Sequence, residues 1–468
     1  MRTLVWFRGK DLRLSDNAAL AEASRDAQVI PLFVAGPELT HGAHRAQFLV
    51  LSAEALARNL EALGTRLVVA RGDAASVVPG RAERWNVDRV VALRRTEPWA
   101  RDEAEKVRKA LRAPLTLLDG ETLLPPETVR TDRGTPYAVF TPFSRAFREL
   151  ASGVGDALPA PKRLPSLPVE VRRDGEPLPT LRELGIERAN GILAAGERAA
   201  RERMKAYLRS RAARYHDTRD RLDLDGTSRL SADLRAGLVS IRAVWHAAHR
   251  ALAGAPQALD AFTKELIWRE FAHALLWDRP ELAREPFRAQ FAAFPWENDR
   301  ALFAAWREGK TGYPVVDASA RQLLAEGFVP NRARMIAASF LTKHALVDYR
   351  WGERHYYEQL TDGDQAQNNT NWQWSTGCGV DAQPYFRIFN PAAQGKKFDP
   401  DGAYVRRWVP ELSRLPARYI HSPAGAPESV LRAAGVVLGR DYPHPVVDHA
   451  MARARFLAIA SSLSADAR

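Results

Sequence analysis

The first 130 residues alternate short apolar runs with longer segments of helical character, and this alternation constrains the fold more than any other feature. Five runs have the length and the Val, Leu and Phe content of buried strands: 4–7, 29–34, 66–70, 89–93 and 115–119. The segments between them repeat apolar residues at the spacing of an amphipathic helix. Strands separated by helices form parallel sheets with helices on both faces, so an α/β domain is predicted.

The loop after the first strand does not carry a familiar phosphate-binding motif. Its sequence, RGKDLRLSDN, matches neither GxGxxG nor GxxxxGK[ST]. The expected architecture is therefore Rossmann-like in its parallel sheet, without a dinucleotide fingerprint in its first turn.

Two further regions follow the α/β domain. Residues 151–190 contain six prolines and little periodicity, which indicates a long connection between domains. From about residue 191, helical patterns follow one another and strand patterns are few. The sequence thus predicts an α/β domain over residues 1–130, a connector over 131–190 and an all-helical domain over 191–468.

The composition limits the classes of protein and of site. The net charge of +12 favours an acidic polymer as partner, although an arginine-rich composition alone gives the same sign. The single cysteine, Cys378, excludes an internal disulfide and thiolate clusters for zinc or iron–sulfur, and it suits a reducing cytoplasm. Met1 leads directly into RTLVWF, without a secretory leader, and no apolar run approaches ~18 residues. We expect a cytoplasmic protein without a membrane span.

Residues 225–231, DGTSRLS, combine a glycine, hydroxyl groups and an arginine where a helix is expected to begin. Backbone N–H groups at a helix start, together with hydroxyls and a guanidinium, suit a phosphate group. The same residues also form an ordinary Ser/Thr N-cap, which is the simpler interpretation of this motif alone.

Three side chains of KELIWREF share one face of the helix expected there, because Glu265, Trp268 and Arg269 stand at positions i, i+3 and i+4. A carboxylate, an indole and a guanidinium together can recognise a flat polar ligand. A surface Glu–Arg pair beside a half-buried tryptophan explains the spacing equally well.

A second helix, expected over NRARM and the residues after it, places Asn331, Arg334 and Met335 on one face. Arg332 points away from that face, where it could meet a different phosphate. A methionine on such a face is usually core filler.

The segment LTDGDQAQNNTNWQW, residues 360–374, gathers polar side chains among aromatic helices. Asp362, Asp364 and Asn368 could bind a metal ion, but their spacing fails the twelve-residue pattern of a calcium loop. Hydrogen bonding to a planar heterocycle fits them better, so no metal site is predicted. On a helix, Trp372 and Trp374 face different directions.

Six motifs stand in order along the chain: FRGKDLRLSDNAAL (7–20), GTSRLS (226–231), ELIWREF (265–271), GKTGYPVVDA (309–318), NRARM (331–335) and WQWSTGCGVDAQPYFRIFNP (372–391). Together they resemble the photolyase/cryptochrome flavoproteins and, more narrowly, a class I cyclobutane pyrimidine dimer photolyase. The resemblance runs nearly end to end, and its last motif is highly specific. It implies an α/β antenna domain, a long connector and an all-helical domain that holds FAD folded back on itself.

The resemblance also implies roles for individual residues. Asn368 would face flavin N5, where an amide supports the reduced flavin without the negative charge of an aspartate. An electron relay would run from Trp372 through Tyr349 to Trp296; the family has tryptophan at position 349, so photoreduction is expected to be slower or rerouted. The other FAD contacts would be Tyr215, Thr227, Ser228, Arg229, Leu230, Ser231, Arg269, Asn331, Arg334, Asp362 and Asp364.

The substrate side of the family pattern is complete in this sequence. Glu265 would hydrogen-bond the dimer, and Trp374 would form a stacking wall for it. Proteins that repair (6-4) lesions place histidine where this chain has Met335. The residues that match the dimer-gripping positions are Glu265, Trp268, Met335 and Trp374, and those expected to contact the DNA backbone are Arg219 and Arg332.

The implied function is light-driven repair, in which photoexcited, reduced FAD passes an electron to a dimer flipped out of UV-damaged DNA and the cyclobutane ring splits. The alternative is a blue-light-sensing cryptochrome that signals and repairs nothing; the complete dimer-gripping set argues against it. The stretch EPWARD, residues 97–102, lacks the Asn-Glu pair of folate-binding members. A deazaflavin or a flavin nucleotide is therefore favoured over folate as a second, antenna chromophore. Nothing in the sequence demands an oligomer, and a monomer is expected.

Overall fold

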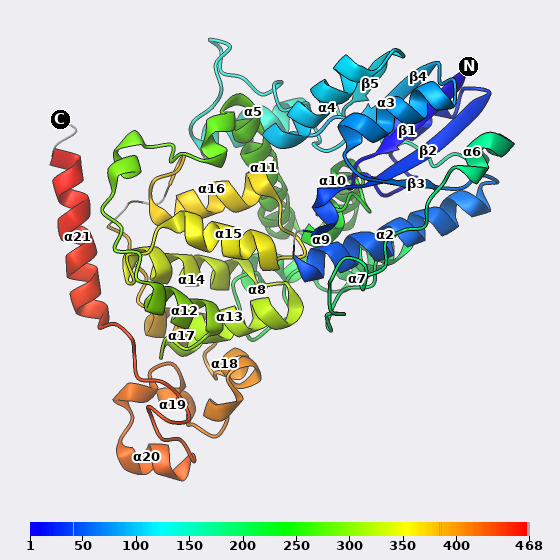
Figure 1. The fold of residues 1–468 in the computed structure, drawn as a ribbon. Coiled ribbons are helices and arrows are strands. Elements are labelled where there is room, and N and C mark those ends of the chain that lie inside the picture. Colours follow the sequence, from blue (N-terminus) through cyan, green and yellow to red (C-terminus); the bar gives the residue numbers. More distant parts are fainter. Residues whose placement is uncertain (41, 383, 385, 466–468) are drawn as a thin grey trace. The chain divides into compact units, whose positions relative to one another are not determined.

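A computed structural model describes residues 1–40, 42–382, 384 and 386–465 (Figure 1). The chain forms two compact units, each built from several segments. Unit 1 comprises Met1–His216, Ser228–Ala283 and Thr361–Gln367. Unit 2 comprises Asp217–Thr227, Arg284–Leu360 and Asn368–Arg468. Segments far apart in the sequence thus share one unit.

Unit 1 contains a five-stranded parallel sheet with the strand order β3-β2-β1-β4-β5 (Figure 1). Leu4 in β1 pairs with Ile30 in β2 and with Val90 in β4, and all three side chains are buried. From β1 the chain adds β2 and β3 on one side of the sheet, and then β4 and β5 on the other side of β1. Open α/β sheets bind ligands where the strand order reverses in this way, here between β1 and β4, at the carboxyl ends of the strands. The prediction of a parallel α/β sheet is confirmed. The strands are β1 (Arg2–Phe7), β2 (Gln28–Ala35), β3 (Val68–Arg71), β4 (Arg89–Leu93) and β5 (Leu115–Leu118).

Helices connect these strands, and two of them, α1 and α3, begin with a side-chain cap. Asn17 accepts a hydrogen bond from the Leu20 N–H at the start of α1, and Asp73 accepts one from the Ala75 N–H at the start of α3. Both strand faces are apolar because helices cover both, as in other parallel sheets. The connecting helices are α1 (Ala18–Ala23), α2 (Ala43–Ala62), α3 (Ala74–Arg84) and α4 (Pro98–Ala110).

The rest of unit 1 is helical. Its longest helix, α11, packs against α5 and α10, and Phe143 of α5 lies 4.9 Å from Phe271 of α11 between ring centroids. The helices are α5 (Phe140–Ala151), α6 (Val169–Arg173), α7 (Glu197–Ser210), α9 (Ser231–Arg235), α10 (Ile241–Ala251) and α11 (Pro256–Asp278), and α8 (Tyr215–Thr218) runs on into the first segment of unit 2.

Unit 2 is built from helices around an aromatic core. α12 and α13 end at Gly309 and Gly327, whose positive φ values of 69° and 61° are the left-handed conformation that glycine adopts at a helix end. Leu323, Leu341 and Trp372 are buried in the core. The prediction of a helical C-terminal region is confirmed. The helices are α12 (Arg300–Glu308), α13 (Pro314–Glu326), α14 (Asn331–Lys343), α15 (Tyr349–Gln359), α16 (Gln365–Thr376), α17 (Pro391–Phe398), α18 (Ala403–Trp408), α19 (Ala417–Ile420), α20 (Glu428–Ala433) and α21 (His449–Ala465).

Candidate functional site

The carboxyl edge of the sheet in unit 1 gathers a buried group of charges, here called the Lys10 cluster and made of Lys10, Glu97, Glu121 and Asp364. Lys10 follows β1, Glu97 follows β4 and Glu121 follows β5, so the parallel topology brings them to one edge. The Lys10 ammonium lies 2.6 Å from Glu121 Oε1 and 2.5 Å from Asp364 Oδ2, and it also contacts Glu97 Oε1. None of the four residues is more than 7% exposed.

Asp364 is held from several sides within unit 1. Its Oδ1 accepts a hydrogen bond of 3.0 Å from the Gln367 N–H in the first turn of α16. The preceding carbonyl, that of Gly363, accepts a bond of 3.0 Å from Arg235 Nε. Burial alone would raise the pKa of Asp364, but the Lys10 ammonium and, less strongly, His273 and Arg269 hold that pKa well below its usual range. Asp364 is therefore an ionised, fixed acceptor at the base of the loop that carries Asp362.

The predicted recognition face of α11 divides into a half-buried part and a buried part. Glu265 and Trp268 are half-buried, and the Trp268 ring stacks on Phe140 with centroids 3.6 Å apart and planes 2° from parallel. Arg269 is only 5% exposed and forms a 2.8 Å ion pair with Glu270. Arg269 is thus not a surface residue, which removes the exposed-pair interpretation for its guanidinium.

The GTSRLS segment has the local geometry of a turn that leads into a short helix. Arg229 adopts a positive φ of 54°, Leu230 is buried, and α9 begins at Ser231. The Ser228 hydroxyl accepts a bond of 3.4 Å from the Leu230 N–H, and Thr227, Ser228 and Ser231 are half-buried. Tyr215, also predicted to contact the cofactor, is 9% exposed and meets Phe262 edge to face.

In unit 2, α14 separates its polar side chains as its helical spacing predicts. Asn331 and Met335 lie on one face, where Asn331 Nδ2 is 3.7 Å from Met335 Sδ. Arg334 Nε donates to the Val329 carbonyl at 2.7 Å. Arg332 points elsewhere and forms a 2.7 Å ion pair with Asp220.

The two arginines predicted to contact DNA share one carboxylate. Asp220 Oδ2 is the partner of Arg332, and Asp220 Oδ1 lies 3.9 Å from Arg219 Nε. The Arg332 guanidinium also covers the Phe398 ring at 4.4 Å. Asp220 was not anticipated from the sequence, although it adjoins Arg219 in the chain.

The two tryptophans of α16 have different environments, as expected. Trp372 is 3% exposed, whereas Trp374 is partly exposed. The Trp372 ring lies against the backbone of Gly352 in α15, where a Cβ atom would come within 2.2 Å of the ring. Earlier in α16, Asn368 Nδ2 donates to the Glu353 carbonyl at 2.9 Å.

The other two predicted relay residues come from adjoining segments of unit 2. The Glu297 N–H donates to the Leu346 carbonyl at 2.9 Å, so the chain that carries Trp296 runs beside the start of α15. Tyr349, the first residue of α15, is 2% exposed, and its hydroxyl has no hydrogen-bond partner among the described residues. Trp351, two residues after Tyr349 in α15, meets Phe303 of α12 edge to face, with ring centroids 5.2 Å apart.

The stretch EPWARD forms the start of α4. Pro98 occupies the first turn, and the Arg95 guanidinium covers the Trp99 ring at 4.6 Å from its centroid. Glu97 belongs to the Lys10 cluster. Glu97 and Trp99 of this stretch thus have structural partners, and the identity of an antenna chromophore stays a prediction.

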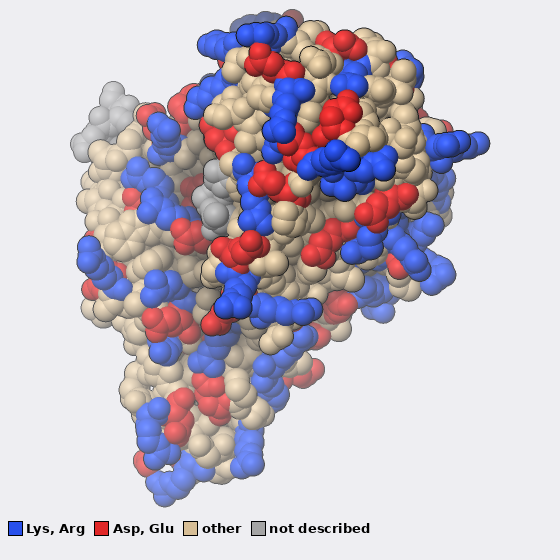
Figure 2. All heavy atoms as spheres, turned by 45° about the vertical axis from the view of Figure 1, so that its right-hand side comes forward, with Lys and Arg blue, Asp and Glu red and all other residues tan. Residues whose placement is uncertain are grey.

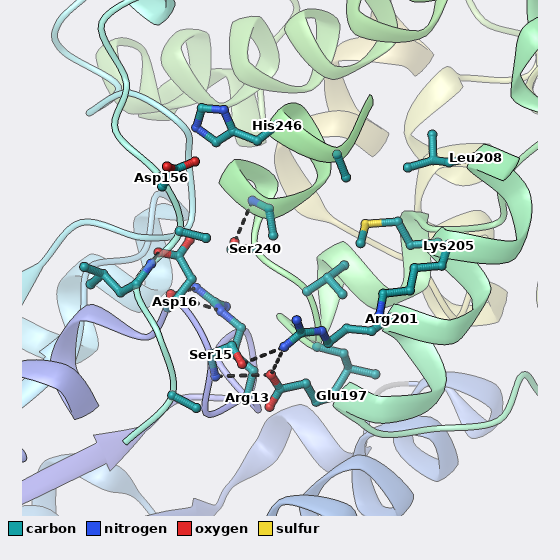
Figure 3. A pocket seen from close by; sticks show the side chains of 18 of the residues that line it. Arg13, Ser15, Asp16, Asp156, Glu197, Arg201, Lys205, Leu208, Ser240 and His246 are labelled. Atoms are coloured by element: carbon teal, nitrogen blue, oxygen red, sulfur yellow. Dashed lines mark hydrogen bonds and ion pairs between the residues drawn. The ribbon is translucent and has the colours of Figure 1, made fainter. Parts of the chain in front are cut away.

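A hollow of about 1080 Å³ in unit 1 lies between α7, α10, the turn at Ser15–Asp16 and residues 156–160 (Figure 3). Glu197 accepts bonds from the N–H groups of Leu14 and Ser15, and Arg201 donates to the Ser15 hydroxyl at 2.8 Å. None of the predicted site residues lines this hollow. Its buried carboxylates already have protein donors, so they do not call for a ligand.

The described residues contain one group of acids and histidine with the geometry of a metal site. Ligand atoms of Glu121, His273 and Asp364 lie within 4.8 Å of one another. The Lys10 ammonium already stands beside two of them.

No described helix combines the length and the apolarity that crossing a membrane requires.

Two family models match the chain: DNA photolyase over residues 3–163, and the FAD binding domain of DNA photolyase over residues 262–462. The deoxyribodipyrimidine photo-lyase of Agrobacterium fabrum is 42% identical over 470 residues, which cover 97% of this chain and 96% of the relative. The chain belongs to the DNA photolyase family. In this photolyase, the FAD-binding model spans the predicted contacts from Arg269 to Asn368, but not Tyr215 or the GTSRLS segment.

Solved structures share the fold over nearly the whole photolyase chain. A bacterial class III photolyase from Agrobacterium tumefaciens has a TM-score of 0.90 at 39% identity, over 99% of this chain and 98% of that one. A Synechocystis cryptochrome has a TM-score of 0.90 at 29% identity, over 98% and 99%. A Sulfolobus tokodaii photolyase with two FAD molecules has a TM-score of 0.83 at 29% identity, over 99% and 100%. The class I assignment stays a prediction.

The residues of this photolyase fit FAD, the cofactor that its family implies. A pyrophosphate needs hydrogen-bond donors, and the GTSRLS turn offers half-buried hydroxyls and the guanidinium of Arg229. The edge of a flavin ring needs both donors and acceptors; the amides of Asn331 and Asn368 in unit 2 are of both types, and the carboxylate of Asp362 in unit 1 is an acceptor. The chemistry of each set suits its part of the cofactor.

Proposed function

We propose that this chain is a deoxyribodipyrimidine photo-lyase, which repairs cyclobutane pyrimidine dimers in UV-damaged DNA under light. The observation that carries the proposal is the 42% identity to a curated photo-lyase over 97% of the chain. Both family models, for the photolyase domain and for its FAD-binding domain, match the chain in addition. The signalling alternative has less support, because the cryptochrome structure is 29% identical.

When bound, reduced FAD supplies the light absorption and the electron that splits the dimer, and the protein supplies binding, orientation and electrostatics. Asn368 is proposed to donate or accept a hydrogen bond at the flavin edge, since its amide is fixed by the Glu353 carbonyl. The hydroxyls of the GTSRLS turn are proposed to bind the phosphates. The proposed cofactor contacts are Tyr215, Thr227, Ser228, Arg229, Leu230, Ser231, Arg269, Asn331, Arg334, Asp362, Asp364 and Asn368.

Four side chains are proposed to grip the flipped-out dimer. Trp268 presents a ring held rigidly by its stack on Phe140, and a rigid aromatic face binds a flat ligand at little cost in side-chain entropy. Trp374 is the partly exposed tryptophan of α16, as a stacking wall requires. Glu265 is proposed to hydrogen-bond the dimer and to stabilise the charge of the added electron. Met335 completes the set.

The DNA backbone is proposed to contact Arg219 and Arg332. Asp220 is bonded to the Arg332 guanidinium at 2.7 Å and lies 3.9 Å from that of Arg219, and a phosphate can compete with this carboxylate for the N–H groups of both arginines. The face in Figure 2 mixes Lys and Arg with Asp and Glu side chains and shows no uniformly basic patch. The charge of +12 thus does not mark this face as the DNA contact.

The proposal also covers the domain boundaries, the oligomeric state, the location, the partner and the second chromophore. We propose the boundaries 1–130 for the antenna domain, 131–190 for the connector and 191–468 for the FAD-binding domain. A monomer in the cytoplasm is proposed, with UV-damaged DNA as partner. A deazaflavin or a flavin nucleotide is proposed as the second chromophore; the Sulfolobus tokodaii photolyase with two FAD molecules supports a flavin.

The deciding experiment combines a spectrum with a repair assay. The visible spectrum of the purified protein should show a bound flavin, and dimers in UV-damaged DNA should disappear under blue light but not in darkness. A yellow protein without light-dependent dimer loss would favour the signalling alternative, and a colourless protein that cannot be loaded with FAD would contradict both functions.

The role of Glu265 is tested by Glu265→Ala. We expect repair per absorbed photon to fall about tenfold, the size expected for one hydrogen bond to a charged group, while binding of damaged DNA changes less. Glu281→Ala, at an exposed glutamate just beyond α11, is the control and should leave both quantities unchanged. Equal repair yields in Glu265→Ala and wild type would count against the proposed role.

A further inference from the structure

The Lys10 cluster is arranged like a cage for a divalent cation, with a lysine ammonium where the ion would stand. One nitrogen, Lys10 Nζ, contacts a carboxylate oxygen from each of Glu97, Glu121 and Asp364. Three carboxylates around one point are a ligand set for a hard divalent cation. Lys10 fills that point with a cation that belongs to the chain itself.

His273 adds a nitrogen ligand to the same cage. Its Nδ1 lies 2.6 Å from the Thr96 hydroxyl, and its Nε2 lies 3.7 Å from Asp364 Oδ1 with no hydrogen-bond partner among the described residues. The imidazole is fully buried, so this nitrogen does not face bulk solvent. Burial lowers the pKa of His273 to about 4, and the ring is therefore neutral at pH 7 and able to act as a ligand.

The acids of the cage are fixed by the rest of unit 1. Glu121 Oε2 accepts a bond of 2.7 Å from the Thr96 N–H, and Glu97 Oε1 lies 3.2 Å from Arg95 Nη2. Asp364 lies on the separate segment Thr361–Gln367, whose backbone is also held by Arg235 through the Gly363 carbonyl. Lys10 is the side chain that ties the Asp364 carboxylate to Glu97 and Glu121 at the carboxyl edge of the sheet.

The contact of Lys10 with Asp364 affects residues that are proposed to bind the flavin. Asp364 caps the first turn of α16 through the Gln367 N–H, and Asp362 lies two residues before it. If Lys10 loses its charge, Asp364 is left buried beside two other carboxylates, and mutual repulsion drives the segment away from the sheet.

We propose that Lys10 is a positioning residue for the flavin: its ammonium is the built-in cation of a carboxylate cage that holds Asp364 and the segment Thr361–Gln367 in the conformation that binds FAD. The proposal rests on the proposed function, in which Asp362 and Asp364 contact FAD. A free divalent cation can take over the role when the lysine side chain is removed, because the cage then offers three carboxylates and a neutral imidazole.

The test is Lys10→Ala, produced with and without Mn²⁺, a cation that accepts both carboxylate and imidazole ligands. Without metal, we expect the FAD dissociation constant to rise about 10- to 100-fold, as for other residues that hold a ligand in place from behind. With Mn²⁺, we expect one bound ion per chain, seen by its electron paramagnetic resonance, together with recovery of FAD affinity and melting temperature. Lys310→Ala, at an exposed lysine paired with Glu308, should show neither effect.

These measurements distinguish a Lys10 that positions the FAD-binding segment from a Lys10 that only stabilises the fold. Unchanged FAD affinity in a destabilised Lys10→Ala protein would overturn the proposal, as would stoichiometric Mn²⁺ that restores the melting temperature without restoring FAD affinity. If Lys10→Ala does not fold, Lys10→Met/Glu97→Gln removes one charge of each sign and should fold with weakened FAD binding; wild-type affinity in it would also overturn the proposal. Failure of wild type to bind FAD would contradict the proposed function instead, whereas Mn²⁺ binding would still report on the cage.

Discussion

Each unit buries a lysine, and the two lysines respond to burial in opposite ways. Lys10 in unit 1 is 4% exposed and stands among three carboxylates. Lys343 in unit 2 is 0% exposed, and its ammonium donates to the carbonyl of Arg387 at 3.1 Å. Burial lowers the pKa of Lys343 to about 7, whereas for Lys10 the charges of Asp364, Glu121 and Glu97 outweigh burial and the pKa is raised.

The same contrast extends to the neighbours of each lysine. Lys343 interacts with Cys378, which in turn interacts with Tyr349 and Glu353; we call Tyr349, Glu353 and Cys378 the Tyr349 group. Burial raises the pKa of Glu353 to about 7 and also raises the pKa values of Tyr349 and Cys378. Unit 1 thus stabilises buried charge by pairing it, while this part of unit 2 favours the neutral forms. Neutral surroundings are consistent with an electron relay through the aromatic core of unit 2, because fixed charges near a redox-active ring change its reduction potential.

The largest effect is expected from breaking a pair in unit 1. Arg95→Met removes a guanidinium that is paired with Glu38 at 2.7 Å and with Glu97 at 3.2 Å, and it leaves the buried carboxylate of Glu97 and the half-buried carboxylate of Glu38 without this partner. We expect the free energy of unfolding to fall by about 3–5 kcal/mol, the usual cost of removing one partner of a buried ion pair. Thermal and denaturant unfolding measure the change.

The surface pair of Arg198 with Glu202 is the matched control for Arg95. The side chain of Arg198 is 90% exposed, so Arg198→Met should change stability by no more than about 0.5 kcal/mol. Similar losses in the two variants would mean that the buried network of unit 1 contributes no more than an exposed ion pair.

The opposite sign is expected in unit 2, where Lys343→Met should stabilise the protein. Between pH 7 and pH 10.5 the unfolded chain binds the lysine proton more tightly than the folded chain, so wild-type stability rises with pH across this window. Methionine removes that penalty and keeps the volume, and we expect a gain of about 2–4 kcal/mol at pH 7, after loss of the bond to the Arg387 carbonyl.

The pH dependence separates this cause from better packing. The gain of Lys343→Met over wild type should shrink as pH approaches 10.5, and Lys310→Met at an exposed site should give no gain at any pH. A gain that does not vary with pH would show that Lys343 is not held neutral by burial.

The two regions also differ in what the sequence could predict. The parallel sheet and the faces of α14 follow from periodicity, and the contact of Asn331 with Met335 and the separate direction of Arg332 agree with helical spacing. The Lys10 cluster was missed, because its members are distant in the chain. Lys10, Glu97 and Glu121 could have been found, since each follows a strand of the sheet and parallel strands end at one edge.

Asp364 and the neutral character of the Tyr349 group could not have been predicted in this way. No periodic pattern states that the segment after α15 returns to the sheet in unit 1. Likewise, Lys343 and Glu353 are charged residue types on amphipathic helices, and only the packing around them shows that they are buried. Tertiary packing decides such cases, and local spacing does not encode it.

The smallest effect on stability is expected from Tyr349→Phe. The hydroxyl of Tyr349 is buried without a hydrogen-bond partner among the described residues, so its removal costs no bond and relieves a desolvated polar group. We expect the free energy of unfolding to stay the same or to rise by up to about 1 kcal/mol. Oxidation of a phenol is easiest when a base accepts its proton, and no base is hydrogen-bonded here; replacing it should therefore leave the rate of flavin photoreduction by an added thiol within about twofold of wild type.

Tyr404→Phe is the matched control for that prediction. Tyr404 is equally buried in unit 2, but its hydroxyl donates to Gln322 Oε1 at 2.8 Å, and loss of this bond leaves the amide oxygen unsatisfied. Tyr404→Phe should therefore cost about 1–3 kcal/mol, in contrast to Tyr349→Phe. If Tyr349→Phe is as destabilising as Tyr404→Phe, then the Tyr349 hydroxyl has a hydrogen-bond partner in solution. If Tyr349→Phe slows photoreduction tenfold, then that partner accepts the proton and the electron relay runs through Tyr349.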